Sequence, residues 1–163
     1  SSKGGENYGW KFNQGSHCHP TTGPGEKCPI VGVLPVAEYP HQEPYPGAEK
    51  LTTGWGCSAQ GLGVANYAGL NQTYLVGDWC SGRLFGIAWD GGASKWQMQE
   101  LLQTALQFTS GTVDADGSVL ATNCVCFYTE DKGPVANPPG SLWRIMAADQ
   151  VPAGAETART RQQ

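Results

Sequence analysis

The sequence predicts an all-β fold of short antiparallel strands joined by tight turns. Aromatic and β-branched residues gather in short runs, which is typical of strands. The 23 glycines and 11 prolines are spread between these runs, so turns between strands explain them better than disorder does. At 163 residues the chain is long enough for one domain with a sizeable core. The strand rhythm alone is compatible with a sandwich, a barrel or a propeller.

The N-terminal third of the chain is predicted to be mostly loop, with short apolar islands at 9–12 and 30–34. Residues 35–41 carry a proline near each end. Because proline cannot donate to a strand ladder, we expect this stretch to lie extended at a sheet edge. Residues 54–58 are predicted to form a short strand.

The clearest regular structure is a pair of strands at 73–79 and 83–89, with a turn at 80–82 between them. Asp-Gly at the start of 90–92 predicts the next turn, because this dipeptide supports positive φ. Residues 96–102 leave strand and helix open. Helix propensity favours a helix, whereas the hairpin rhythm around the segment favours the strand that we expect.

A last group of elements is predicted after residue 113. Residues 114–117 read Asp-Ala-Asp-Gly, which predicts a turn between two strands, and a strand at 119–122 leads out of it. A loop at 132–140 precedes a final strand at 141–145. The segment 148–163 is predicted to be a polar C-terminal tail.

Two acidic positions have both a structural and a functional interpretation. Residues 114–117 resemble the start of a calcium loop, but the twelfth position, where such a loop needs Glu, is Val125. A hairpin turn is therefore preferred there. Asp78 is expected to accept hydrogen bonds from nearby backbone amides rather than to catalyse.

Composition and charge restrict the function classes. The net charge of −4 and the pI near 5.2 give no basic surface for nucleic acid or anionic membranes. No apolar run is long enough to span a bilayer. Neither a G-x-S-x-G motif nor a nucleotide-binding fingerprint is present. The sequon Asn71-Gln72-Thr73 is a candidate N-glycosylation site.

Cysteine usage points to an extracytoplasmic location, whether secreted, extracellular or periplasmic. Six cysteines in a chain of this size favour an oxidising compartment. We expect Cys18 and Cys28 to close a short loop as a disulfide. The neighbouring His17 and His19 permit a metal cluster as the alternative, but their spacing lacks the close ligand pairs of structural zinc sites.

The other four cysteines are less constrained by the sequence. Cys57 and Cys80 flank strands that should be neighbours, so we expect a second disulfide between them. Cys124 and Cys126 are two residues apart and would share one strand face close to the upper limit for direct bonding. Free thiols, a strained pair, or pairing with another chain all remain open for these two.

Three segments, taken in chain order, resemble one protein family. Residues 4–10 read GGENYGW, residues 74–84 read YLVGDWCSGRL, and DADGS at 114–118 is followed by GSLWRI at 140–145. These segments are similar to the GGxNYGW turn, the Y-V-F-G-D-x-C-S-G-R strand pair and the closing strand pair of the glucose/sorbosone dehydrogenase-like proteins. That family includes the soluble quinoprotein sugar dehydrogenases and shares its propeller with hedgehog-interacting proteins, so the resemblance does not settle activity.

The resemblance implies a six-bladed β-propeller of four-stranded antiparallel sheets. Residues 1–147 would form its C-terminal two to three blades only. A propeller closes by pairing its first and last blades, so we expect the remaining blades to come from the same or another chain. The start at Ser1, without a signal peptide, likewise favours an internal segment.

The family also implies pyrroloquinoline quinone and calcium as cofactors, with a catalytic base and calcium ligands from earlier blades. Two cationic positions that help hold the quinone should lie in this chain. They correspond here to Ala59-Gln60 and to Gln107-Phe108-Thr109, neither of which carries a cation. A tricarboxylated quinone needs fixed positive charge, so the segment alone is expected to be inactive.

Three functions therefore stay open. The chain is part of a quinoprotein oxidoreductase acting on sugars, or it belongs to a non-catalytic structural or binding propeller of the same family. The third is a secreted carbohydrate-binding β-domain in which exposed tryptophans stack on glycan. The more usual role of tryptophan in propellers is to fill the space between blades, and we expect that here.

Overall fold

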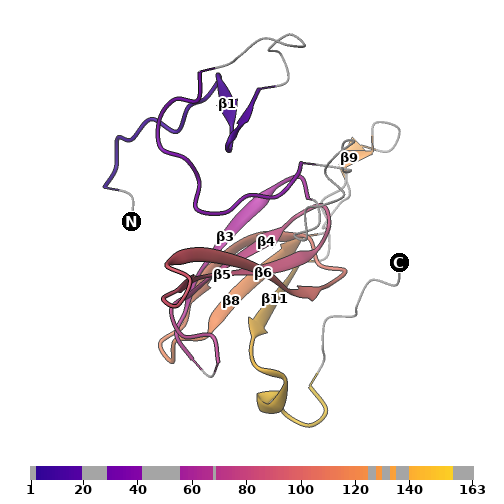
Figure 1. Ribbon diagram of the computed structural model, residues 1–163. Coiled ribbons are helices and arrows are strands. Elements are labelled where there is room, and N and C mark those ends of the chain that lie inside the picture. The colour runs from indigo at the N-terminus through magenta and orange to yellow at the C-terminus, as the bar shows by residue number, and fades with distance from the viewer. Residues whose placement is uncertain are drawn as a thin grey trace. The chain divides into compact units, whose positions relative to one another are not determined.

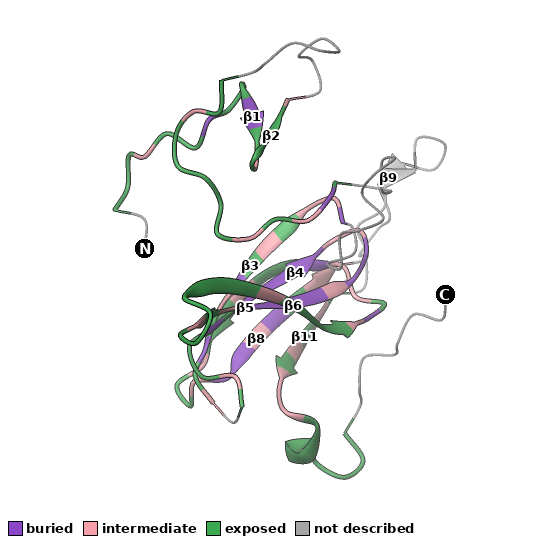
Figure 2. Ribbon diagram, viewed as in Figure 1, coloured by how far each residue is buried: buried purple, intermediate pink, exposed green. Residues whose placement is uncertain are grey.

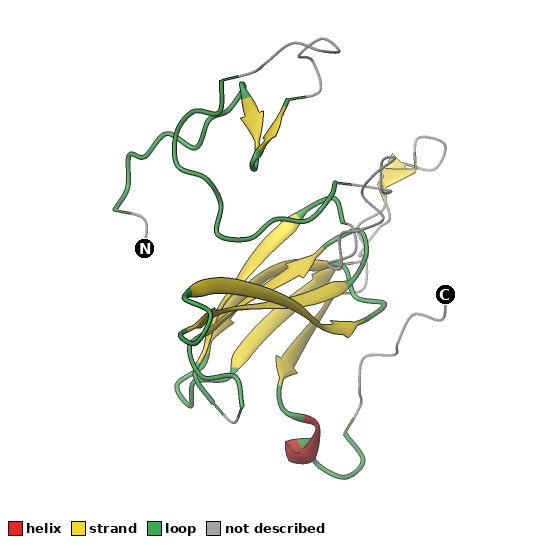
Figure 3. Cartoon of the chain, in the orientation of Figure 1, coloured by secondary structure: helices red, strands yellow, loops and turns green. Residues whose placement is uncertain are grey.

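A computed structural model describes residues 3–19, 29–41, 56–67, 69–124, 128–129, 133–134 and 140–155. They belong to two compact units, Ser1–Glu38 and Tyr39–Gln163. The described part is all-β, with antiparallel sheets of two, three and four strands, which confirms the all-β part of the predicted fold class. Strands and loops predominate, and one short helical turn follows the last strand (Figure 3).

The first unit contains one small hairpin among loops. β1 (Asn13–Gln14) pairs with β2 (His17–Cys18). Asn13 is buried, and its Nδ2 donates to the carbonyl oxygen of Gly15 at 3.0 Å. Its Oδ1 accepts from the backbone N–H of Val31 at 3.2 Å. The Asn13 side chain thereby joins the hairpin to a later segment of the same unit.

The second unit begins with a four-stranded antiparallel sheet whose strands are neighbours in chain order (Figure 1). The strands are β3 (Ala59–Ala65), β4 (Thr73–Asp78), β5 (Arg83–Asp90) and β6 (Lys95–Gln103). The strands predicted at 73–79 and 83–89 are confirmed. Residues 96–102 form a strand and not a helix, because β6 pairs with β5 along its whole length.

A second antiparallel sheet follows, in the order β7-β8-β11. Its strands are β7 (Phe108–Val113), β8 (Val119–Cys124) and β11 (Gly140–Ile145). The strands predicted at 119–122 and 141–145 are thus confirmed. β9 (Tyr128–Thr129) and β10 (Gly133–Pro134) pair between β8 and β11, and a 3-10 helix, η2 (Ala148–Gln150), follows β11.

The expectations for the segment before β3 are tested only in part, because residues 42–55 lie outside the described residues. Within 35–41 only His41 pairs, through one parallel bridge to Gly56. Pro40 accepts from the Gly56 N–H at 3.1 Å and has no N–H of its own to donate. Of the strand expected at 54–58, the described residues contribute only this bridge. The strand begins instead at Ala59, where glycines weaken the sequence signal.

A hydrophobic core lies between the two larger sheets (Figure 2). Its buried residues come from both of them: Leu62, Ala65, Leu75, Leu84, Phe108, Val119 and Ala121. β3, the first strand of one sheet, lies beside β7, the first strand of the other. Gly111 in β7 permits this approach, because a Cβ at that position would lie 2.6 Å from the Cα of Leu62.

Candidate functional site

Asp78, at the end of β4, is the centre of the most connected polar cluster among the described residues of the second unit. Its side chain is fully buried. Oδ2 accepts hydrogen bonds from the Tyr39 hydroxyl and from the backbone N–H groups of Cys57 and Ser58, each at 2.9 Å. Oδ1 accepts from the Ser81 N–H at 2.7 Å and the Ser81 hydroxyl at 2.8 Å. We call these five residues the Asp78 cluster.

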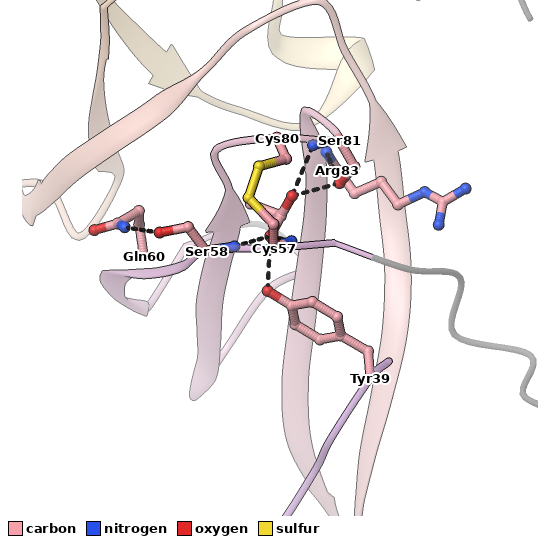
Figure 4. The surroundings of a disulfide bond; sticks show 8 residues. Tyr39, Cys57, Ser58, Gln60, Cys80, Ser81 and Arg83 are labelled. Carbon is pink, nitrogen blue, oxygen red and sulfur yellow. Dashed lines mark hydrogen bonds between the residues drawn. A yellow bond between two sulfur atoms is a disulfide. The ribbon is translucent and has the colours of Figure 1, made fainter. Parts of the chain in front are cut away.

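The Asp78 cluster draws together three chain segments around one disulfide. Figure 4 shows Tyr39, Ser58 and Ser81 around the bond between Cys57 and Cys80. The Cα atoms of this pair are 5.6 Å apart, and the bond joins the segment just before β3 to the turn after β4. This is the second disulfide that the sequence leads us to expect.

The protonation of the cluster follows from its hydrogen bonds. Burial acts to raise the pKa of the Asp78 carboxyl group, but the bonds from Ser81, Ser58 and Tyr39 outweigh it and hold the pKa below its ordinary value. Burial, with the charge of Asp78, raises the pKa of Tyr39 far above its usual range. Asp78 is therefore a carboxylate whose two oxygens are both engaged. It organises loops, as expected, and is not placed to act as a base.

The first of the two quinone positions, Ala59-Gln60, lies at the start of β3. Ala59 pairs with Asp78 in the adjacent strand, and Gln60 donates from Nε2 to the Ser58 hydroxyl at 2.9 Å. The charge next to this position is thus the buried carboxylate of Asp78. A negative charge here disfavours a bound tricarboxylate.

The second quinone position lies at the start of β7. Phe108 is buried in the core, against Gly77 of β4. The Gln107 N–H donates to Asn123 Oδ1 at 2.6 Å, while the buried Gln107 Oε1 has no hydrogen-bond partner among the described residues. An unpaired acceptor attracts a donor and repels a carboxylate. The described residues at the two positions therefore do not fit pyrroloquinoline quinone.

Two arginines of the sheets are committed to acidic partners. Arg83 Nε lies 3.3 Å from Glu100 Oε2 and donates to Gln103 Oε1 at 2.8 Å. Arg144 binds the carboxylates of Asp114 and Asp116 in the β7–β8 turn, at 2.9 Å from Asp116. Neither arginine replaces the cations missing from positions 59–60 and 107–109.

The Asp114–Gly117 segment is a hairpin turn, as predicted. Gly117 has a φ of 84°, and its N–H donates to the Asp114 carbonyl at 2.9 Å. The Arg144 guanidinium binds both carboxylates, so its positive charge offsets one of their two negative charges. Among the described residues no group of three or more His, Cys, Asp or Glu side chains is arranged to hold a metal ion.

In the first unit, His17 and Cys18 have different partners. His17 Nε2 lies 3.2 Å from Glu38 Oε1, and Glu38 also accepts from the backbone N–H and the hydroxyl of Ser16. Burial opposes ionisation of Glu38, but these partners outweigh it and lower its pKa. Cys18 is disulfide-bonded. Its expected partner, Cys28, lies outside the described residues.

The open question about the last cysteine pair is answered for one member. Cys124, at the end of β8, is disulfide-bonded, which excludes a free thiol there. Cys126 lies outside the described residues. The candidate glycosylation site, Asn71, lies exposed in the turn between β3 and β4.

One face of the β3–β6 sheet carries exposed apolar side chains that sequence analysis did not assign to a site. Register places Val64 opposite Tyr74 and Trp89 opposite Trp96 on this face, and they are 41–54% exposed. We call these four residues the aromatic face. The two tryptophan rings contact edge to face, with centroids 5.7 Å apart.

The role expected for tryptophan is therefore not seen between the described sheets. Among the described residues no tryptophan is buried. Phenylalanine, alanine and aliphatic residues fill the shared core instead.

Comparison with known proteins matches no family model and no solved structure. The resemblance to the sugar dehydrogenase-like proteins thus rests on the three sequence motifs. The Cys57–Cys80 disulfide is compatible with an extracellular location. No helix in the described part of the chain is long and apolar enough to cross a membrane.

Proposed function

We propose that this chain supplies blades of a secreted, sugar dehydrogenase-like β-propeller, and that these blades act as scaffold rather than as quinone site. Strand topology is compatible with the proposal. Four antiparallel strands in chain order are followed by a second sheet whose first strand lies beside the first strand of the sheet before it. Successive propeller blades share this arrangement, since each blade begins near the central channel.

The observation that carries the proposal is the aromatic face. A blade within a propeller is covered on both sides. In the β3–β6 sheet the core covers one side, and on the other side Val76, Phe85 and Ile87 are buried, with Tyr39 stacked on Phe85. That other side also exposes Val64, Tyr74, Trp89 and Trp96. Contiguous apolar surface of this kind marks a contact site. The occupant that we propose is the preceding blade of the same propeller, supplied by the same or another chain.

The scaffold role follows from how charge is used in the described sheets. The buried carboxylate fixes loops through the Asp78 cluster, and Arg83 and Arg144 pair with acidic side chains. The two positions where the family holds its quinone are neutral in sequence. If the assembled protein oxidises sugars, the residues that bind its quinone cofactor come from other blades.

A quinone titration tests the scaffold role. Pyrroloquinoline quinone is added to the purified chain with Ca²⁺ in excess, and binding is followed by quenching of tryptophan fluorescence and by calorimetry. We expect no saturable binding. Saturable, stoichiometric binding by the chain would contradict the proposal. Sugar-dependent dye reduction by the polypeptide that carries all blades then decides between an active and a degenerate propeller.

The exposed Trp89–Trp96 pair favours carbohydrate binding as the second candidate function. Tryptophan offers a large rigid surface with a polar edge, which suits sugar rings. Oligosaccharide titration of the chain, compared with Trp89→Ala and Trp96→Ala, tests this function. Loss of oligosaccharide binding in both variants would favour carbohydrate binding over the scaffold role, because a face covered by another blade has no room for glycan.

A further inference from the structure

Asn71, Gln72 and Thr73 lie in the turn between β3 and β4 and form the acceptor sequence for N-linked glycosylation. We propose that Asn71 carries an N-linked glycan, transferred to the chain in the secretory pathway. This proposal stands on the turn itself and does not rest on the proposed function.

The turn presents Asn71 at its outer corner. The Thr73 N–H donates to the Leu70 carbonyl at 3.2 Å, which makes Asn71 and Gln72 the two central residues. Gln72 has a φ of 55°, and both central residues are exposed. Within the described part of the chain, no hydrogen bond engages the Asn71 side-chain amide. The nitrogen that would carry the glycan is therefore accessible and uncommitted.

The surroundings of the turn have room for a bulky group. A Cβ built at Gly69 would meet no atom within 4 Å, so the space beside the turn is open. The base of the loop is held by bonds that a glycan would not disturb. The Asn66 N–H donates to the Gly117 carbonyl at 3.0 Å, and the Tyr67 hydroxyl donates to the Ile145 carbonyl.

Thr73 constrains when the glycan is attached. In the folded chain Thr73 is buried, its hydroxyl donates to the Asn71 carbonyl oxygen at 3.5 Å, and its methyl group faces Gly86. The transferase must read this hydroxyl, so transfer precedes closure of the β3–β4 pair. When the chain then folds, Asn71 stays exposed to solvent and Thr73 becomes buried.

The chemistry of the step is a substitution at an anomeric carbon. The Asn71 amide nitrogen bonds to C1 of the first sugar, while the bond from C1 to the phosphate oxygen of a lipid-linked oligosaccharide breaks. The lipid pyrophosphate leaves, and the amide proton passes to a base of the transferase. No electron transfer is involved.

Matched variants separate the sequon from the fold. Asn71→Gln removes the acceptor nitrogen. Thr73→Val removes the hydroxyl that the transferase reads but keeps the branched shape beside Gly86, while Thr73→Ser keeps the hydroxyl and loses the methyl group. Each full chain is expressed in a eukaryotic host behind a secretion signal. It is then digested with peptide N-glycosidase in heavy-oxygen water.

We expect digestion to shift the wild-type chain and Thr73→Ser to lower mass and to leave Asn71→Gln and Thr73→Val unchanged. The wild-type Asn71 should become an Asp that carries the heavy-oxygen label. The proposal is overturned if Asn71 is unmodified in both the secreted and the cell-retained wild-type chain. Retained variants are scored as well, because the transfer precedes folding.

Discussion

Replacing Asp78 by asparagine should destabilise the second unit by about 3 kcal/mol. The carboxylate accepts five hydrogen bonds, three at Oδ2 and two at Oδ1. Asparagine has one acceptor oxygen, so at best it keeps the three hydrogen bonds that Oδ2 accepts in the wild type. Its NH₂ group then faces the Ser81 N–H, and leaving that buried donor unpaired costs about 1–3 kcal/mol. Loss of the charge from the remaining bonds adds about 1 kcal/mol.

Urea unfolding followed by tryptophan fluorescence measures this difference, and calorimetry should show a melting temperature lower by roughly 6–12 °C. Asp149→Asn is the matched control, because Asp149 is an exposed residue of η2. It should change the free energy of unfolding by less than about 0.5 kcal/mol. Equal unfolding midpoints for wild type and Asp78→Asn would refute the account of this cluster.

The same variant should alter the pH dependence of stability. The folded-state pKa of Asp78 lies below its ordinary value, so the folded state holds fewer protons than the unfolded state in the acid range. The stabilisation from Asp78 is complete above the unfolded pKa, near 4, and is lost as the pH falls through the folded pKa. Asp78→Asn should flatten this part of the curve.

Three further outcomes are expected. Replacing Cys57 and Cys80 by serine should cost about 3 kcal/mol, because the bond spans 23 residues of chain and restricts the unfolded state; no loss in urea would contradict this. Gly77→Ala should cost about 1–3 kcal/mol by forcing a methyl group into the ring packed over it, while Gly91→Ala, which meets no neighbour, should not. The Glu38 carboxyl group should titrate below its ordinary pKa in an NMR experiment, and stability of the first unit should fall as the pH drops through that value.

The strands with aromatic and β-branched residues were predictable, and β3 was not. β4 and β5 carry runs such as Tyr74-Leu75-Val76, whose local signal agrees with the final pairing. β3 reads AQGLGVA, a sequence with weak strand propensity. It becomes a strand because glycines at 61 and 63 allow β4 and β7 to approach closely. That reason lies in tertiary contacts, so no local pattern reveals it.

The site could be predicted in part. The structural role of Asp78 and its position next to a disulfide could be predicted, because Asp78 is a polar residue at the end of a predicted strand and lies close to Cys80 in the sequence. Tyr39 as a partner could not be foreseen, since it lies 39 residues away from Asp78 along the chain. The exposure of the aromatic face could not be predicted either. The alternation of side chains along a strand shows that Trp89 lies on the same side of the sheet as Ile87, but it does not show which side the core covers.

The central claim is that the aromatic face is a blade-to-blade contact, and hydroxyl-radical footprinting of Trp89 and Trp96 tests it most directly. Oxidation of both side chains is measured by mass spectrometry in the isolated chain and in the polypeptide that carries the remaining blades. Their exposure of 54% and 43% predicts fast oxidation in the isolated chain. The account predicts strong protection of both in the larger polypeptide, with Trp10, at 70% exposure in the first unit, as an internal reference. Equal oxidation of Trp89 and Trp96 in the two samples would contradict it.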